Sequence, residues 1–222
     1  MNIVISFLTI FLLYGEKAPP LFEEKEGILA VEAEDFAGQQ LADIRKWYLI
    51  TKKTDVSSLK ADSELHYEAA SNKAYLEILP DTRKTHDDTL THGVNFTNKA
   101  GEMAVLNYKV YFNNPGKYYV WVRAYSTGTE DNGIHVGIDN TWPESGQRMQ
   151  WCEGKNQWTW ESKQRTVEEH CGVPELIWID VPTKGEHTIS FSMREDGFEF
   201  DKWVMTKDYE KPEGKGPKPV KK

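Results

Sequence analysis

The clearest pattern along the chain is an alternation of apolar and polar residues with a period of two. It is strongest at residues 116–140, where GKYYVWVRAYS and DNGIHVGIDN read as two strands of a hairpin joined by a loop. In the first strand one face is suited to a core: Tyr118, Val120, Val122 and Ala124. The other face is either covered by a second layer or offered to a ligand: Tyr119, Trp121, Arg123 and Tyr125.

Strand-like segments bounded by turn residues recur through the chain. They lie at residues 27–36, 47–51, 71–79, 102–112, 175–181, 186–193 and 198–206. Since no stretch keeps a helical period over three turns, about nine strands predict an all-β fold, an antiparallel β-sandwich spanning residues 27–208. The expected core includes these residues: Val120, Val122, Ile134, Val136, Ile138, Ile189 and Phe191.

Long loops rich in tryptophan interrupt the strands. Residues 141–173 are the least regular segment and hold four of the eight tryptophans: Trp142, Trp151, Trp158 and Trp160. Core packing alone does not require tryptophan in loops, because its indole ring also serves exposed contacts. Each ring therefore either binds a ligand or packs under the loops, and we expect about half of them to be buried.

The two ends of the chain differ from its body. Residues 1–15, MNIVISFLTIFLLYG, are apolar but too short for a comfortable membrane span. They are similar to the apolar part of a secretory signal, although no Lys or Arg precedes them; a buried first strand is the alternative. We expect a signal peptide within residues 1–18 and a secreted, periplasmic or cell-surface protein without membrane attachment after cleavage. The basic tail at residues 209–222, rich in Lys, Pro and Gly, is predicted to be disordered.

Charge and motifs exclude several functions. The net charge is -8, and no basic patch stands out in the body of the chain, so nucleic-acid binding is not expected. The chain contains no Gly-rich phosphate loop and no Gly-x-Ser-x-Gly elbow.

The only two cysteines, Cys152 and Cys171, flank the irregular loop. In an exported protein we expect them to form a disulfide that closes this loop. In a reducing compartment they would instead be free thiols. Two cysteines alone make a poor metal site.

Acidic residues offer a further candidate site. Glu32 and Glu34 lie two positions apart, on one face of a predicted strand, and would repel each other unless a cation lay between them. A calcium ion could be this cation. The alternative is that no cation is bound and both glutamates are simply solvated. A loop cluster is a weaker metal candidate: His86, Asp87, Asp88 and His92.

Three motifs occur in a fixed order: VEAEDF, then PGKYYVWVRAYS with DNGIHVGIDN, and finally GEHTISFSMREDGFEFDKWVMT. This series resembles family 6 and family 35 carbohydrate-binding modules and the C-terminal module of family 115 glucuronidases. The resemblance covers nearly all of residues 27–208. It implies a jelly-roll sandwich, polysaccharide binding in a secreted glycan-degrading system, and a structural calcium held by Glu32, Glu34 and Asp201. On strict strand alternation, Asp201 would lie on the face of Glu199 and Trp203.

The resemblance also implies sugar sites in the loops at one end of the sandwich or on a concave sheet face. Aromatic candidates are Tyr125, Trp142, Trp151, Trp158 and Trp160. Polar partners are Glu130, Asp131, Asn132 and Arg148. The Trp-rich insertion and residues 39–63 depart from the family pattern. We expect the ligand to be an extended glycan. It is either anionic, in which case Arg148 could pair with a carboxylate of the glycan, or neutral.

The leading hypothesis is a non-catalytic polysaccharide-binding protein. The first alternative is a lyase or glycoside hydrolase on a β-sandwich. A glycosidase needs paired acids, and a lyase could use His135 with Tyr119 or Tyr125. The second alternative is a surface adhesion module with a protein partner.

Overall fold

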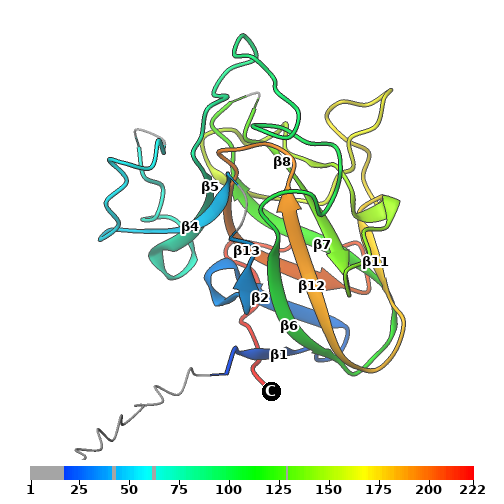
Figure 1. Ribbon diagram of the computed structural model, residues 1–222. Coiled ribbons are helices and arrows are strands. Elements are labelled where there is room, and N and C mark those ends of the chain that lie inside the picture. The colour runs from blue at the N-terminus through cyan, green and yellow to red at the C-terminus, as the bar shows by residue number, and fades with distance from the viewer. Residues whose placement is uncertain (1–17, 42–43, 62–63, 129) are drawn as a thin grey trace, which may run out of the picture.

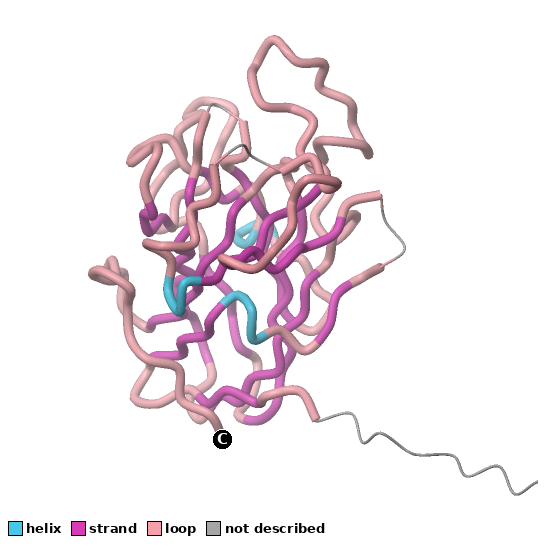
Figure 2. The backbone as a smooth tube through the Cα atoms, turned by 90° about the vertical axis from the view of Figure 1, so that its left-hand side faces the viewer, coloured by secondary structure: helices cyan, strands magenta, loops and turns pink. Residues whose placement is uncertain are grey.

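The computed structural model describes residues 18–41, 44–61, 64–128 and 130–222. Two β-sheets pack face to face in this part of the chain, which confirms the predicted all-β sandwich (Figures 1 and 2). The expected signal peptide falls on residues 1–17, outside the described residues. No helix within the described ranges is long and apolar enough to cross a membrane.

The first sheet, sheet A, follows the order β1 (Leu21–Glu23), β6 (Leu106–Phe112), β12 (Gly185–Met193), β8 (Gly133–Ile138) and β9 (Met149–Gln150), with β3 (Gly38–Gln39) also pairing with β6. The second sheet, sheet B, follows the order β10 (Trp158–Glu161), β7 (Gly116–Tyr125), β13 (Glu199–Thr206), β5 (Ala74–Leu79) and β4 (Lys46–Thr51). In sheet B, β11 (Trp178–Val181) also pairs with β7, and β2 (Ile28–Glu32) with β13. Pairing is antiparallel except between β1 and β6. The described part of the chain also has three short 3-10 helices: η1 (Ala33–Asp35), η2 (Ser71–Lys73) and η3 (Glu144–Gly146).

The core lies between the sheets, where period-two side chains from both inner faces meet. All seven residues predicted for the core are buried: Val120, Val122, Ile134, Val136, Ile138, Ile189 and Phe191. Aromatic rings cross from one sheet to the other, with Phe191 of sheet A 4.9 Å from Phe200 of sheet B. The Tyr108 hydroxyl donates to the Ala33 carbonyl at 2.7 Å, so even this buried polar group is satisfied.

The predicted hairpin at residues 116–140 is wrong in its pairing. β7 pairs with β13, β10 and β11 in sheet B, whereas β8 pairs with β12 and β9 in sheet A. The loop between β7 and β8 therefore crosses from one sheet to the other. Alternation reports which side chains share a face, but it does not report which strand supplies the hydrogen bonds, and here sequence neighbours are not sheet neighbours.

Two details of the acidic strands also differ from expectation. β2 ends at Glu32, and Glu34 lies in η1 rather than on the same strand. In β13 the register shifts between Phe200 and Lys202, a β-bulge, so Phe200 and Trp203 both belong to the core cluster. Strict alternation would have placed those two residues on opposite faces, and the expected grouping of Asp201 with Trp203 is therefore wrong.

The C-terminal segment (residues 207–222), for which the composition predicts disorder, lies over the outer face of sheet B and reaches β1 of sheet A at its end. The Trp160 indole Nε1 donates to the Gly214 carbonyl at 3.0 Å, and the Tyr209 ring lies 4.8 Å from the Trp121 ring. At the far end, the Lys222 N–H donates to the Leu21 carbonyl at 2.9 Å. Composition predicts disorder from low apolar content, but these contacts come from strands distant in sequence.

The remaining outer surface of sheet B is partly covered by the loop after β4. Ile50, Tyr75 and Leu79 form a small cluster there with Ala70. Half-buried side chains of the loop pack against it: Val56, Leu59, Ala61, Leu65 and Tyr67. The predicted disulfide is confirmed, since Cys152 and Cys171 are bonded with their Cα atoms 5.3 Å apart. It ties the segment before β10 to the segment before β11.

Candidate functional site

The four tryptophans of the irregular loop have different environments. Trp151 is fully buried with its ring 5.0 Å from Phe198, and Trp160 is 3% exposed beneath the C-terminal segment. Trp142 is half-buried, and its indole lies so close to Gly101 that a Cβ there would come within 2.2 Å of Nε1. Trp158 is also half-buried, but it lines an open cavity. Burial of two of the four matches the expected division.

The polar candidates of the β7–β8 loop are internal. Glu130 forms an ion pair with Arg83, and Asp131 accepts a hydrogen bond from Thr127 Oγ1 at 3.0 Å. The Asn132 side-chain oxygen accepts from Gln150 Nε2. All three candidates are buried, so the structure does not bring Glu130, Asp131 and Asn132 to the aromatic residues as ligand contacts.

Tyr125 and Trp158 do come together, at the end of sheet B. We call this site the aromatic cleft; its principal side chains are His66, Arg123, Tyr125 and Trp158, and its cavity has a volume of about 460 Å³. Tyr125 ends β7 and is the Cα partner of Trp158, which begins β10. The period of two places Arg123 on the same outer face of β7 as Tyr125. Leu65, Glu68, Ala69, Asn156 and Gln157 complete the lining.

Ring contacts hold the aromatic cleft in one geometry. The His66 and Tyr125 rings stack with centroids 3.6 Å apart and planes 13° apart. Trp158 meets Tyr125 edge-on at 5.6 Å, and its Nε1 donates to the His66 carbonyl at 3.0 Å. The Arg123 guanidinium lies 5.6 Å from the Trp158 ring centroid. These contacts restrict both the loop that carries His66 and the orientation of the indole.

Buried carboxylates support the cleft from beneath. Glu199 accepts from His66 Nδ1 at 2.7 Å, and Asp201 is paired with Arg123. Burial raises the pKa of Asp201, and the Arg123 hydrogen bond and charge oppose that rise. The Ser71 N–H also donates to Asp201, at 2.7 Å. Since the charge of Arg123 is balanced internally, the cleft presents ring surfaces, the amides of Asn156 and Gln157, and one exposed carboxylate, that of Glu68.

The arrangement has the groups that can bind a sugar ring. Flat aromatic surfaces pack against the C–H face of a pyranose, while amides such as Asn156 and Gln157, both exposed, can bond its hydroxyls. Tyr125 and Trp158 are two of the five aromatic candidates named from the sequence, and the structure brings these two together. His66, Asn156 and Gln157 were not among the candidates. Arg123 had been noted only as part of the outer face of β7.

The carboxylates expected to hold calcium are each engaged with another side chain. Glu32 accepts from Lys202 Nζ at 2.9 Å, Asp201 pairs with Arg123, and Glu34 accepts from Asn72 Nδ2 at 3.1 Å. One buried oxygen of Glu32 and one of Glu34 have no hydrogen-bond partner in the described part of the chain. Burial, together with the charges of Glu32 and Asp201, raises the pKa of Glu34 to about 7.

Within the described ranges, no three or more His, Cys, Asp or Glu side chains are placed to hold a metal ion. At the carboxylates, the bulge of β13 turns Lys202 toward Glu32, so a lysine supplies positive charge there. The two buried oxygens of Glu32 and Glu34 still fit a hard cation in their chemistry. In the loop candidate, His86 and Asp87 are exposed, and Asp88 accepts from the Thr85 N–H at 2.9 Å.

The lyase pairing considered from the sequence is not formed. His135 is fully buried in β8 of sheet A, whereas Tyr119 and Tyr125 lie in β7 of sheet B. Its Nδ1 accepts from the Arg148 N–H at 3.0 Å, and Nε2 lies 3.2 Å from the Thr97 carbonyl. Burial is the main cause that lowers the pKa of His135 to about 3. A buried histidine with both nitrogens engaged is not available as a base.

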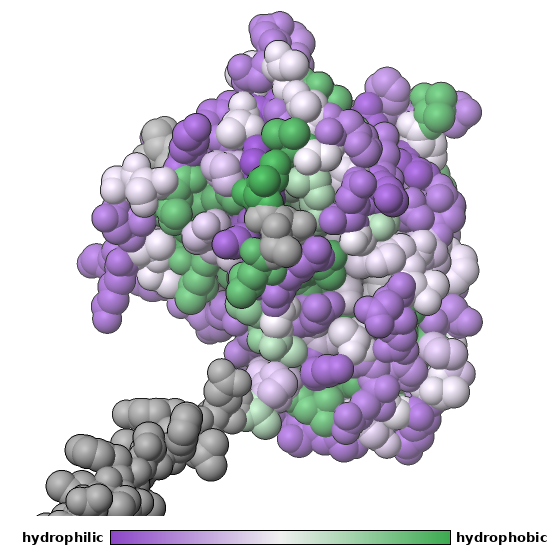
Figure 3. Space-filling view, viewed as in Figure 1, coloured by the Kyte–Doolittle hydropathy of each residue, from purple (hydrophilic) through white to green (hydrophobic). Residues whose placement is uncertain are grey.

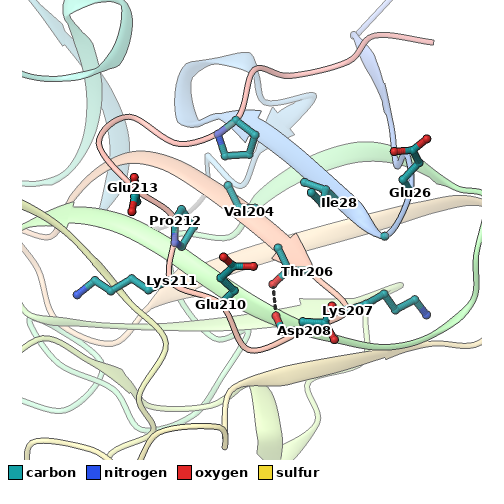
Figure 4. A pocket seen from close by; sticks show the side chains of 12 residues that line it. Glu26, Ile28, Val204, Thr206, Lys207, Asp208, Glu210, Lys211, Pro212 and Glu213 are labelled. Atoms are coloured by element: carbon teal, nitrogen blue, oxygen red, sulfur yellow. Dashed lines mark hydrogen bonds between the residues drawn. The ribbon is translucent and has the colours of Figure 1, made fainter.

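A different cavity lies between the C-terminal segment and sheet B (Figure 4). It measures about 330 Å³, with Ile28 and Val204 among its lining residues and charged side chains such as Glu210 and Lys211 around them. Among the described residues no aromatic side chain lines it, so those residues offer no ring for stacking on a sugar. The face in Figure 3 is mostly hydrophilic, with some apolar side chains near its centre.

Comparison with known proteins places the chain in a family. A family model described as "Glycosyl hydrolase family 115 C-terminal domain" matches residues 21–219. "Uncharacterized protein P23" of Formosa agariphila is 61% identical over 186 residues, covering 84% of this chain and 45% of that protein. The chain thus spans less than half the length of this relative.

Two crystal structures of an exo-β-1,3-galactanase from Phanerochaete chrysosporium, one with β-1,3-galactotriose and one with galactose, are distantly similar. They are 10% and 12% identical with TM-scores of 0.37 and 0.32, covering 81% and 80% of this chain and 29% of each galactanase chain. Likeness at this level says nothing about a ligand. The family match, in contrast, extends over nearly the whole described chain. The chain therefore belongs to the glycosyl hydrolase family 115 C-terminal domain family.

Proposed function

We propose that this domain binds polysaccharide without cleaving it, as a component of a secreted or cell-surface glycan-degrading system. The aromatic cleft is the proposed binding site. The observation that carries the proposal is the difference in burial among the aromatic side chains of the loops. Trp151 and Trp160 are buried, whereas Tyr125 and Trp158 line an open cavity that also has exposed amide side chains. Membership of a glycoside hydrolase-associated family supports a carbohydrate ligand.

Binding would combine stacking with hydrogen bonds from a prearranged site. The rings are already positioned by the His66–Tyr125 stack and by the Trp158–His66 hydrogen bond, so little side-chain freedom is lost on binding. Water competes for every sugar hydroxyl, however, and the glycan must be ordered. We expect dissociation constants on the order of micromolar to millimolar.

The finer assignment to family 6 or family 35 carbohydrate-binding modules is also a proposal. It is supported by the order of the three sequence motifs and by a sandwich with an aromatic cleft at one end of a sheet. It predicts recognition of a few sugar units rather than a long crystalline surface, because a cavity of about 460 Å³ holds only a short stretch of glycan.

A structural calcium is proposed at the free oxygens of Glu32 and Glu34, with Asp201 nearby. Its support is the two buried oxygens without hydrogen-bond partners among the described residues and the raised pKa of Glu34. A cation there would offset the repulsion between carboxylates, and it would stabilise the folded state by mass action. Melting curves with calcium and with a chelator test this proposal. Calcium should raise the melting temperature, and identical melting temperatures would show that no structural calcium is bound.

Calorimetric titration with a panel of soluble polysaccharides tests the binding site. Trp158→Ala should weaken binding of the best ligand by about fivefold or more, since stacking on one ring contributes on the order of 1–3 kcal/mol. Trp178→Ala is the matched control, because Trp178 is a half-buried strand tryptophan elsewhere in sheet B and should bind as the parent does. Equal binding by Trp158→Ala and the parent would place the site elsewhere.

The competing functions are separated by the same samples. Analysis of the glycan after prolonged incubation should show an unchanged chain length; new reducing ends or unsaturated products would establish an enzyme. If no polysaccharide binds but the domain retains a protein on the cell surface, the adhesion hypothesis replaces the proposal. The structure disfavours His135 as a catalytic base, because it is buried and both ring nitrogens are engaged.

A further inference from the structure

A separate cavity lies at the end of sheet A and gathers three arginines. We call it the arginine cavity; it has a volume of about 660 Å³, and Arg148, Arg165 and Arg194 are among its lining residues. Arg194 directly follows β12, and Arg148 directly precedes β9. Arg165 lies in the loop between β10 and β11, the loop at the upper right of Figure 1 that is coloured yellow.

Arg194 is built into the wall of the cavity. It is 4% exposed, and its Nη1 donates hydrogen bonds to the side-chain oxygen of Gln150 and to the carboxylate of Glu195. Its guanidinium carbon lies over the Phe96 ring, 5.0 Å from the ring centroid, and this cation–π contact helps to fix the guanidinium group. The Arg194 Nε has no hydrogen-bond partner in residues 18–41, 44–61, 64–128 and 130–222. A buried charged donor without an acceptor is costly, and an anionic ligand would satisfy it.

Arg148 is fixed by the backbone around it. Its φ of 56° lies in the left-handed region, and its N–H donates to His135 Nδ1 at 3.0 Å. Its Nε donates to the Arg165 carbonyl at 3.2 Å, and its Nη2 pairs with Glu144, whose side chain is 69% exposed. The pair with Glu144 is therefore close to solvent, where an ion pair contributes little and can be exchanged for another anion.

Arg165 has no carboxylate partner in the described part of the chain. Its Nη1 donates to the His170 carbonyl at 3.3 Å, and it is half-buried. Burial, followed by the positive charge of Arg194, lowers the pKa of Arg165, and the charge of Glu195 opposes this shift. The acidic lining residues are Glu144, which is engaged with Arg148, and Glu168. Although the chain has a net charge of -8, Arg165 has no ion pair with a carboxylate among the residues that the structure describes.

We propose that the arginine cavity binds an oxyanion substituent of a glycan, a carboxylate or a sulfate ester, through Arg165 and the Nε of Arg194. A guanidinium presents parallel N–H groups that match two oxygens of such a group. The glycan as the source rests on the proposed function, whereas the anion chemistry does not. The cavity is distinct from the aromatic cleft, since the two share no lining residue. It would select anionic chains over neutral ones.

Nuclear magnetic resonance of arginine side chains in the whole protein tests the proposal. Sodium sulfate and sodium glucuronate are the probes, while glucose and sodium chloride at matched ionic strength are the controls. We expect saturable shifts of the Nε–Hε signals of Arg165 and Arg194 with one or both probes, and none with glucose or chloride. A preference for glucuronate identifies the carboxylate, and a preference for sulfate identifies the ester.

Variants connect the shifts to the cavity. Arg165→Gln should weaken binding of the preferred anion by about tenfold or more, because a charge-assisted bidentate contact is lost. Lys52→Gln removes an exposed cation at the far edge of sheet B and should leave binding unchanged. Parent-like binding by Arg165→Gln, or equal shifts with chloride, would overturn the proposal. Trp158→Ala should not alter anion binding, so failure at the aromatic cleft is distinguishable from failure here.

Discussion

The pH dependence of folding should report directly on His135. This side chain is fully buried, its Nδ1 accepts a hydrogen bond from the Arg148 N–H, and Nε2 faces the Thr97 carbonyl, so it carries its single proton on Nε2. Burial is the main cause that lowers its pKa from 6.5 to about 3, with the charges of Arg194 and Arg148 acting in the same direction. The folded protein therefore holds a neutral imidazole down to strongly acidic pH.

The sign of the effect follows from the two pKa values. Between pH 6.5 and about 3, the unfolded chain binds a proton at His135 and the folded chain does not. Stability from the neutral imidazole is thus complete above pH 6.5 and is lost as the pH falls. At pH 5, which is 1.5 units below 6.5, the loss is about 2 kcal/mol at 1.36 kcal/mol per unit.

Urea unfolding of the parent and of His135→Gln at pH 7.5 and 5.0 measures this term. Glutamine reaches a similar length, can donate to the Thr97 carbonyl, and does not titrate. The free energy of unfolding should fall between the two pH values by about 2 kcal/mol more in the parent than in the variant. His86→Gln, which removes an exposed histidine, should keep the parent's pH dependence.

Equal pH dependence of the parent and of His135→Gln would refute the reasoning. It would mean that His135 exchanges its proton in the folded state near its ordinary pKa, and so is open to solvent or to a substrate. His135 would then again be a candidate for a catalytic base, and this result would support the alternative that the protein is a lyase.

Three further predictions concern stability. Tyr209→Ala removes the ring that packs on Trp121 and should lower the free energy of unfolding by about 2 kcal/mol in chemical denaturation, whereas an unchanged value would mean that the C-terminal segment does not cover sheet B. Replacing Cys152 and Cys171 with serine should cost about 2–4 kcal/mol in the same assay, and a cost near zero would contradict a closed loop. Gly101→Ala should lower the melting temperature by several degrees, because φ is 77° and Trp142 fills the space.

The sequence predicted the sandwich and its core because alternation depends only on local spacing. Val120 and Val136 are buried as that spacing required, yet β7 and β8 lie in different sheets, because pairing depends on strands far along the chain. The bulge in β13 could not be predicted from the sequence either, because no residue type in FEFDKWVMT marks the position of the extra residue. It is this bulge that turns Lys202 toward Glu32, where the family resemblance led us to expect calcium.

The site was predicted only in part, for the same reason. Tyr125 and Trp158 were named from their aromatic character, but burial of Trp160 depends on the C-terminal segment, which is 54 residues from it at Gly214. His66 belongs to a loop without any pattern, and its partner Glu199 is 133 residues away. Long-range contacts of this kind determine which aromatic rings remain available to a ligand.

A hydrogen-exchange footprint of the protein saturated with its best polysaccharide ligand tests the central claim most directly. The account predicts slower exchange at residues 65–69, at 123–125 and at 156–158, the three segments that contribute the lining of the aromatic cleft, with the glycan recovered at its original length. An anionic glycan should add protection near Arg165. Protection confined to other parts of the chain, or recovery of a shortened glycan, would contradict non-catalytic binding at the aromatic cleft.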